Sequence, residues 1–290
     1  IVEDDLLELV KYGANVNCQD YDGCTPLHFA LREGKLRLCG KLIKEYGASP
    51  IISTFKGETC LHRAVTMDDH QAVQFFLSFQ DVRNNVDEVD DNDRTALALA
   101  ATVDGLNSVS IARLLLARGA DVHRAGDETA KWRHRARTAL HWAAASNSVG
   151  VMQVLLQHQA DVNAVDEYGC TPLVLAVSHG QECAARVLLE AHANTGVADQ
   201  QGRRAMDLAL VAGRESLAQT IKWYEEATVS SLKIKTNRRK KATSTSRGRV
   251  SSTLQRRVRE YREMEMGIRE VEDEVSGREW ITVWRGYGKQ

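Results

Sequence analysis

The chain has 290 residues, of which 43% are hydrophobic and 27% are charged, with a formal net charge of -1. These values are usual for a folded soluble protein, and only 3 prolines occur, which excludes a collagen or a mucin-like stalk. No apolar run approaches the roughly 18 residues needed to span a bilayer. The 6 cysteines form no C-x-x-C pair, so the sequence indicates free thiols rather than a zinc site or a redox dithiol.

One six-residue motif recurs through residues 1–224. Its five clear copies and one worn copy are TPLHFA from Thr25, TCLHRA from Thr59, TALALA from Thr95, TALHWA from Thr138, TPLVLA from Thr171 and RAMDLA from Arg204. The copies start 34, 36, 43, 33 and 33 residues apart. A second apolar run and an ending such as GANVN or GADVH belong to each unit, so the motif marks a repeat of near 33 residues.

Each unit predicts two short helices joined by a turn. Thr25 suits the N-cap of a first helix, and Pro26 suits its first position. Leu27 and Ala30 lie on one helix face, and Gly34 ends that helix. The Asx-rich linkers at residues 19–23 and 165–169 read as hairpin turns. One unit cannot bury its apolar face alone, so we expect the units to stack into an elongated solenoid.

The period and the T-P-L-H-x-A motif resemble the ankyrin repeat over residues 1 to about 224. The resemblance implies an all-α repeat solenoid of helix pairs joined by hairpin-like loops. We expect a partial repeat at residues 1–20 and the solenoid proper at residues 21–224, with a polar last unit as its cap. Because the chain opens at Ile1, inside a second helix, we also expect a fragment of a longer protein.

Three segments depart from the repeat. We expect an extended hairpin at residues 81–93 and a helix-turn insertion near residues 103–108. A further insertion at residues 125–135 contains Trp132 and Arg133 among other basic residues. It is either a solvated loop whose Trp folds back on the solenoid, or a finger that anchors a partner, since Trp and Arg are enriched at interface hot spots.

The tail differs from the body in charge. Residues 225–290 carry 16 Lys and Arg against 10 Asp and Glu, whereas residues 1–224 carry 22 against 29. We expect a basic Ser/Thr-rich linker at 225–253, an amphipathic helix at 254–275 and a C-terminal tail at 276–290 with a strand-like Trp280–Trp284 segment. A basic cluster in the linker resembles a nuclear-import signal, although a merely solvated linker explains it equally well; it comprises Arg238, Arg239, Lys240 and Lys241.

Catalytic and cofactor signatures are absent from the sequence. It has no phosphate-binding loop, no nucleophile elbow, no H-E-x-x-H and no kinase motif. His28, His62 and His141 occupy the fourth position of the repeat motif, which favours structural hydrogen bonds over metal ligation. We therefore predict a protein that is not an enzyme and has no catalytic residues, no cofactor and no metal.

The resemblance implies a binding surface on the concave side and the hairpin tips. The residue after each motif tetrad faces the concave side in that family, and here these residues are Phe29, Arg63, Leu99, Trp142 and Leu175. Of these and the hairpin-tip residues, we single out Tyr21, Phe29, Phe55, Arg63, Trp142 and Tyr168 as partner-binding candidates. The leading hypothesis is a non-catalytic scaffold or adaptor for other proteins, without membrane contact, in the cytoplasm or nucleus and monomeric. One alternative is a nuclear regulator or transcription-factor inhibitor whose basic tail contacts nucleic acid. Another is the ankyrin fragment of a larger enzyme or channel.

Overall fold

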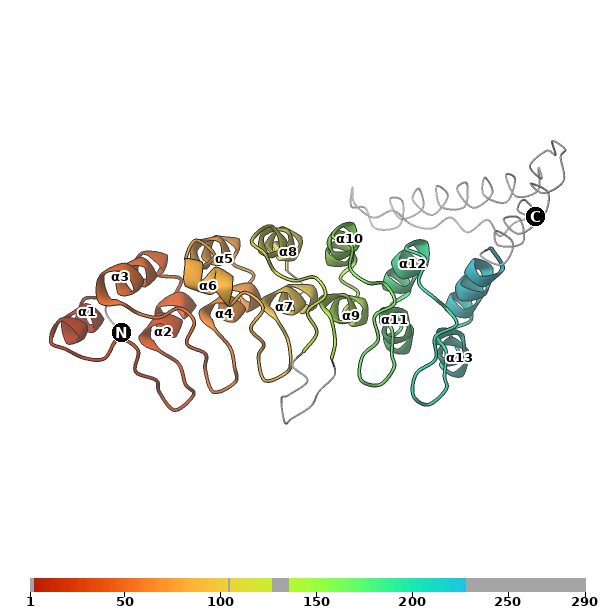
Figure 1. Ribbon diagram of the computed structural model, residues 1–290, viewed down its shortest axis with the longest axis horizontal. Coiled ribbons are helices and arrows are strands. Elements are labelled where there is room, and N and C mark those ends of the chain that lie inside the picture. Colours follow the sequence, from red (N-terminus) through yellow and green to blue (C-terminus); the bar gives the residue numbers. More distant parts are fainter. Residues whose placement is uncertain (1–2, 104, 127–135, 228–290) are drawn as a thin grey trace, which may run out of the picture. The chain divides into compact units, whose positions relative to one another are not determined.

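A computed structural model describes residues 3–103, 105–126 and 136–227. Twelve of its named helices form two layers (Figure 1). The inner layer comprises α2 (Pro26–Arg32), α4 (Cys60–Thr66), α7 (Ala96–Thr102), α9 (Ala139–Ala145), α11 (Pro172–His179) and α13 (Ala205–Val211). The outer layer comprises α1 (Glu3–Lys11), α3 (Leu36–Tyr46), α5 (His70–Phe76), α8 (Ser108–Ala117), α10 (Val149–Gln157) and α12 (Glu182–Glu190). Residues 215–227 are also helical. The all-α repeat solenoid is confirmed.

The repeat motif starts each inner helix as its residues predict. A threonine in extended backbone occupies the N-cap of five inner helices, namely Thr25, Thr59, Thr95, Thr138 and Thr171. Successive inner helices lie side by side, from α2 beside α4 to α11 beside α13. Each short helix depends on this packing, because a helix of about two turns is unstable alone in water.

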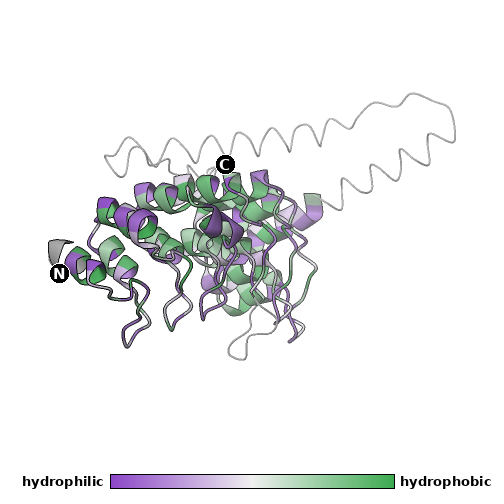
Figure 2. Ribbon diagram, turned by 60° about the vertical axis from the view of Figure 1, so that its left-hand side comes forward, coloured by the Kyte–Doolittle hydropathy of each residue, from purple (hydrophilic) through white to green (hydrophobic). Residues whose placement is uncertain are grey.

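The core runs continuously between the two layers (Figure 2). The leucine at the third motif position is at most 3% exposed in each of the five clear copies, and the alanine at the sixth position at most 4%. Each fully buried leucine stabilises the fold by about 1.5–3 kcal/mol. The small alanine lets neighbouring helices approach closely, so one large and one small position define each inter-unit contact.

The prediction of an extended hairpin at residues 81–93 is wrong for the first half of that segment. A short extra helix, α6 (Gln80–Asn84), follows α5 there, and a hairpin closes only around Val89 and Thr95. Val82 and Val86 are 3% and 5% exposed, so these apolar side chains hold a helical turn on the core. The segment at 105–107 is a turn before α8, in which the Asn107 side chain donates to the Asp68 carbonyl at 2.9 Å.

Candidate functional site

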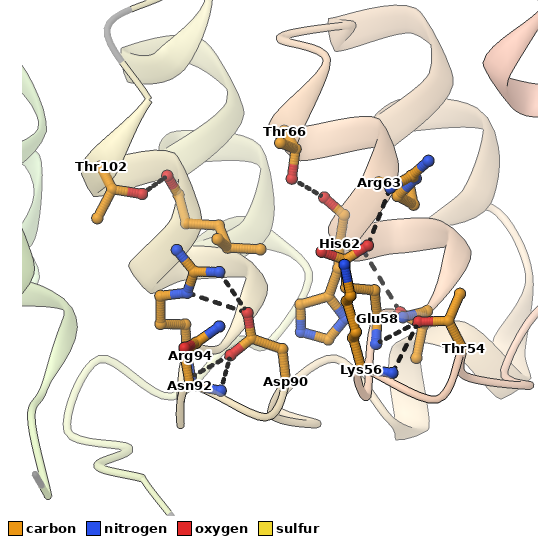
Figure 3. A network of polar contacts seen from close by, with 12 residues as sticks. Thr54, Lys56, Glu58, His62, Arg63, Thr66, Asp90, Asn92, Arg94 and Thr102 are labelled. Carbon is orange, nitrogen blue, oxygen red and sulfur yellow. Dashed lines mark hydrogen bonds and ion pairs between the residues drawn. The ribbon is translucent and has the colours of Figure 1, made fainter. Parts of the chain in front are cut away.

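One hydrogen-bond pattern recurs in the hairpins between units. An Asp carboxylate oxygen accepts from the backbone N–H groups two and four residues later, as Asp20 does from Asp22 at 2.9 Å and Cys24 at 2.7 Å. Asp90, Asp166 and Asp199 repeat the pattern. In the second hairpin the Thr54 hydroxyl takes this role, at 3.3 Å (Figure 3). The short Asp side chain thereby fixes a tight turn and turns its tip residues outward.

Neighbouring hairpins are joined by backbone hydrogen bonds at their tips. The N–H of Phe55 donates to the carbonyl of Asp22 at 3.0 Å, and the N–H of Asp91 donates to that of Lys56 at 3.0 Å. Farther along, Gln200 donates to Tyr168 at 2.9 Å. These bonds make each run of tips a connected edge rather than a set of independent loops.

Large side chains stand on this edge. Tyr21 is fully exposed, Phe55 is 65% exposed and Tyr168 is 49% exposed. Exposed aromatic side chains on a rigid backbone are common in protein interfaces, because each buries a large surface area on binding and loses little rotamer entropy. The edge therefore offers aromatic contacts at positions that the hairpin hydrogen bonds fix.

The first two units add charged groups beside the edge. The Arg32 guanidinium lies over the Phe29 ring at 4.7 Å from its centroid. Arg63 on α4 pairs with Glu58 at 3.0 Å (Figure 3). Between these residues lies a polar hollow of about 270 Å³, which Lys56 also lines. Both signs of charge are present there, so this part suits a partner with mixed polar groups.

The fourth unit holds a buried polar cluster. The Arg137 guanidinium lies over the Trp142 ring at 5.5 Å and pairs with the Asp166 carboxylate at 3.1 Å. Arg137 and Asp166 are 9% and 4% exposed, and Trp142 is half-buried. The pair joins two hairpins of different units. The Asp166 carboxylate also accepts from the backbone N–H of Tyr168.

The predicted partner-binding residues fall in two groups. Tyr21, Phe55 and Tyr168 lie on the hairpin tips, whereas Phe29, Arg63 and Trp142 lie on inner helices and are only half-exposed. The residues at the same motif position in the third and fifth units were expected on the concave side, but Leu99 and Leu175 are 3% and 5% exposed. The apolar side chain of Leu99 packs into the core instead, and that of Leu175 is likewise buried.

Several predicted features lie outside the described residues. These are Trp132 and Arg133 of the insertion, the basic cluster Arg238, Arg239, Lys240 and Lys241, the amphipathic segment 254–275 and the Trp280–Trp284 segment.

The motif histidines are structural, as their positions predict. The backbone N–H of Thr25, Thr59 and Thr138 donates to Nδ1 of the histidine three residues later at 3.2 Å. The other ring nitrogen of His141 lies 3.1 Å from the carbonyl oxygen of Cys170 in the next unit. Burial lowers the pKa of His141 to about 4 and also lowers the pKa of His28 and His62. His62 makes the corresponding contact to the carbonyl oxygen of Glu88 at 3.0 Å, so neutral His62 and His141 bridge successive units.

Sequence reasoning missed the Arg137–Asp166 pair. A signal existed in two other hairpins, where an Asp and an Arg four residues apart form an ion pair: Asp90 pairs with Arg94 and Asp199 with Arg203, each at 2.7 Å. The residue four positions before Arg137 is an arginine. Arg137 instead forms an ion pair with Asp166 of the following hairpin, and a search for pairs within one hairpin does not find it.

The described residues show no cluster suited to a metal. No group of three or more His, Cys, Asp or Glu side chains in that part of the chain is placed to hold an ion. None of the described helices is long and apolar enough to cross a membrane.

The chain matches models of ankyrin repeats over most of its length. The matches cover residues 5–43, 42–126, 123–199 and 140–229. Among curated proteins, Protein glp-1 of Caenorhabditis elegans is 33% identical over 184 residues, which is 63% of this chain and 14% of that protein. The p105 subunit of nuclear factor NF-kappa-B from Gallus gallus is 29% identical over 60% of this chain and 17% of its own length. The palmitoyltransferase ZDHHC17 of Danio rerio is 35% identical over 59% of this chain and 26% of its own length. The chain thus spans about a quarter or less of each of these relatives.

Proposed function

Because this chain belongs to the ankyrin-repeat family, whose repeats are protein–protein interaction modules, we propose that it is a non-catalytic scaffold or adaptor. It holds partner proteins against the hairpin edge and the adjoining inner helices. The observation that carries this proposal is the set of aromatic side chains fixed on a hydrogen-bonded edge, above all Trp142 and Tyr168 around the Arg137–Asp166 pair. The cytoplasm or nucleus is the proposed location, and a monomer is the proposed state.

Comparison of captured proteins tests this surface. The purified chain, the double variant Trp142→Ala plus Tyr168→Ala and the control Tyr12→Ala are immobilised in turn, and bound proteins are quantified by mass spectrometry. Tyr12 is 88% exposed in the turn after α1, away from the hairpins. We expect the double variant to lose the proteins that the control retains. Because Trp142 packs partly against the core, the variant should melt at a lower temperature, so capture is compared well below the melting transition of each chain. Identical captured sets would refute this choice of surface.

A second candidate is a nuclear regulator or transcription-factor inhibitor with a nucleic-acid-contacting tail. Residues 233–262 carry 12 Lys and Arg against one acid, Glu260. Phosphate contacts release counterions, so binding to a DNA duplex would weaken steeply as salt rises. The experiment measures duplex affinity between about 50 and 200 mM salt. Absence of binding at the low-salt end would remove this candidate.

A third candidate is the ankyrin part of a larger enzyme or channel. It is supported by the small share of each relative that the chain covers, including a palmitoyltransferase. Sequencing the full transcript on both sides of residues 1–290 tests it.

A further inference from the structure

Arg137 is more buried than the paired arginines of other hairpins, yet it makes fewer hydrogen bonds. Its Nε–H donates to Asp166 Oδ2 at 3.1 Å, and none of the described residues accepts from its two terminal NH2 groups. Arg94 instead donates from both Nε and one terminal nitrogen to Asp90, at 3.0 and 2.7 Å (Figure 3). The Arg94 side chain is 25% exposed, whereas that of Arg137 is 10% exposed. Because buried polar groups are normally hydrogen-bonded, the unused edge of the Arg137 guanidinium requires an explanation.

The groups that contact Arg137 leave hydrogen-bond donors unused. Both oxygens of Asp166 already accept, since Oδ1 takes the N–H groups of Tyr168 and Cys170 at 3.0 and 2.8 Å and Oδ2 takes Arg137. The indole N–H of Trp142 is buried and has no acceptor within the described part of the chain. The Trp142 ring lies 5.5 Å from the Arg137 Cζ. Since a guanidinium has five N–H donors in one plane, this cluster has donors to spare and lacks acceptors.

The charges around the cluster are balanced. Arg137 and Asp166 form one pair, and in the next hairpin Nε and NH2 of Arg203 lie 2.9 and 2.7 Å from Asp199 Oδ2. His141 on α9 adds no charge at neutral pH, because burial lowers its pKa to about 4. A single added negative charge therefore meets no net repulsion. It can be held by the planar fork of Arg137, through the nitrogens that Asp166 does not use.

We propose that the terminal NH2 groups of Arg137 bind an Asp or Glu side chain of a partner protein. This inference rests on the proposed function and names the chemical group that the partner presents to the hairpin surface. A carboxylate is planar and accepts two parallel N–H bonds from a guanidinium. The half-buried Trp142 ring beside Arg137 offers apolar contact to the neighbouring partner residues. A phosphate carries nearly two charges, so the adjacent Asp166 repels it more strongly and a phosphorylated residue fits less well.

Peptide selection on the full chain tests the proposal with the partner still unknown. Random peptides displayed on phage are selected on the immobilised chain. Those that the variant Trp142→Ala plus Tyr168→Ala no longer captures are synthesised, and each is compared with copies in which one acid becomes its amide, Glu to Gln or Asp to Asn. We expect one acid in each peptide whose amide copy binds about tenfold or more weakly, because a hydrogen bond between charged groups is lost. Peptides without such an acid would overturn the proposal and leave the hairpin surface in place.

Two matched arginine variants locate the acid. Arg137→Lys keeps a positive charge beside Asp166 but removes the planar fork, and Arg203→Lys makes the same change where both fork nitrogens already face Asp199. The acidic peptides should bind Arg137→Lys about tenfold more weakly and Arg203→Lys as they bind the unaltered chain. On Arg137→Lys, the acid and amide copies should bind almost equally, because the group that distinguishes them is gone. Full discrimination by Arg137→Lys, or an equal loss in Arg203→Lys, would place the acid elsewhere and overturn the proposal.

The remaining outcomes separate this proposal from the proposed function. The comparison of acid and amide on the unaltered chain does not depend on how well any variant folds. A selection that yields no peptide dependent on Trp142 and Tyr168 would refute the hairpin surface and this inference together. A phosphoserine copy that binds more tightly than the acid, and loses this advantage on Arg137→Lys, would identify a phosphorylated ligand and contradict the carboxylate.

Discussion

At the residue scale, the buried motif histidines make the solenoid sensitive to acid. Burial places the pKa of His141 at about 4 in the folded chain, against 6.5 when exposed. Between these values the unfolded chain binds more protons, so stability falls as pH drops from about 6.5 toward 4, at up to about 1.4 kcal/mol per pH unit for this residue. Urea unfolding between pH 7.5 and 5 measures the slope. His141→Ala, which copies Ala98 of the third unit, should reduce that slope, and a slope equal to that of the wild type would refute the assignment.

Asp87 is a second residue whose charge is unfavourable where it stands. It accepts from the N–H of Asp121 at 3.0 Å, as Asn163 accepts from Asn194 at 2.7 Å. Burial raises the pKa of the Asp87 carboxyl, and the charge of Asp121 adds to this effect. Asp87→Asn keeps the acceptor without the charge, so we expect a gain of roughly 0.5–1 kcal/mol at pH 7. The reverse change Asn163→Asp should destabilise, and chemical denaturation of both variants checks the pair.

At the scale of the hairpin, a glycine permits the bond between the first two tips. Gly23 has φ +78°, and a Cβ there would lie 2.4 Å from the backbone nitrogen of Phe55, which donates to Asp22. Gly202 has φ +76° with no atom within 4 Å of its Cβ position. An alanine at either position is strained by about 1 kcal/mol or more, because the backbone keeps a positive φ. Only Gly23→Ala must also break the hydrogen bond from the Phe55 N–H to the Asp22 carbonyl. We expect it to be the less stable variant, with faster hydrogen exchange at the Phe55 amide. Equal stabilities would show that the tip bond contributes nothing.

The hairpin ion pairs differ in burial and should differ in strength. Asp166→Asn keeps the acceptor for the Tyr168 and Cys170 N–H groups but leaves Arg137, 9% exposed, without its carboxylate. We expect a loss of about 3 kcal/mol, because an uncompensated charge remains buried. Asp199→Asn removes the partner of Arg203, whose side chain is 49% exposed, so we expect a loss below about 1 kcal/mol. Denaturant midpoints compare the two, and a larger effect at Asp199 would contradict this account.

At the scale of the whole molecule, the sequence predicts the repeated helices well but predicts poorly the features in which single units differ from the repeat. The Thr caps and the motif leucines and alanines carry enough local chemistry to place five of the six inner helices, and α13 follows from the period alone, with Arg204 at its cap. Segment 80–84 escaped prediction because its helix depends on Val82 reaching the core rather than on a repeated motif. The Arg137–Asp166 pair escaped because it crosses from one unit to the next. Leu99 and Leu175 were predicted on the concave surface but are buried. The fifth motif position, which they share with the half-exposed Arg63 and Trp142, is exposed in some units and buried in others.

Stability of the solenoid should depend on where along the stack a contact is lost. Leu140 is fully buried on α9, which lies between α7 and α11, whereas Met206 on α13 is only half-buried in the last unit. In a stack with nearest-neighbour coupling, Leu140→Ala should cost about 2–5 kcal/mol and uncouple the two halves. Its urea curve should then separate into two transitions when followed by circular dichroism. Met206→Ala should cost less than about 1.5 kcal/mol and keep one main transition, because it disturbs a single terminal neighbour. Equal losses at both positions would mean that the repeats do not unfold as a chain of coupled neighbours.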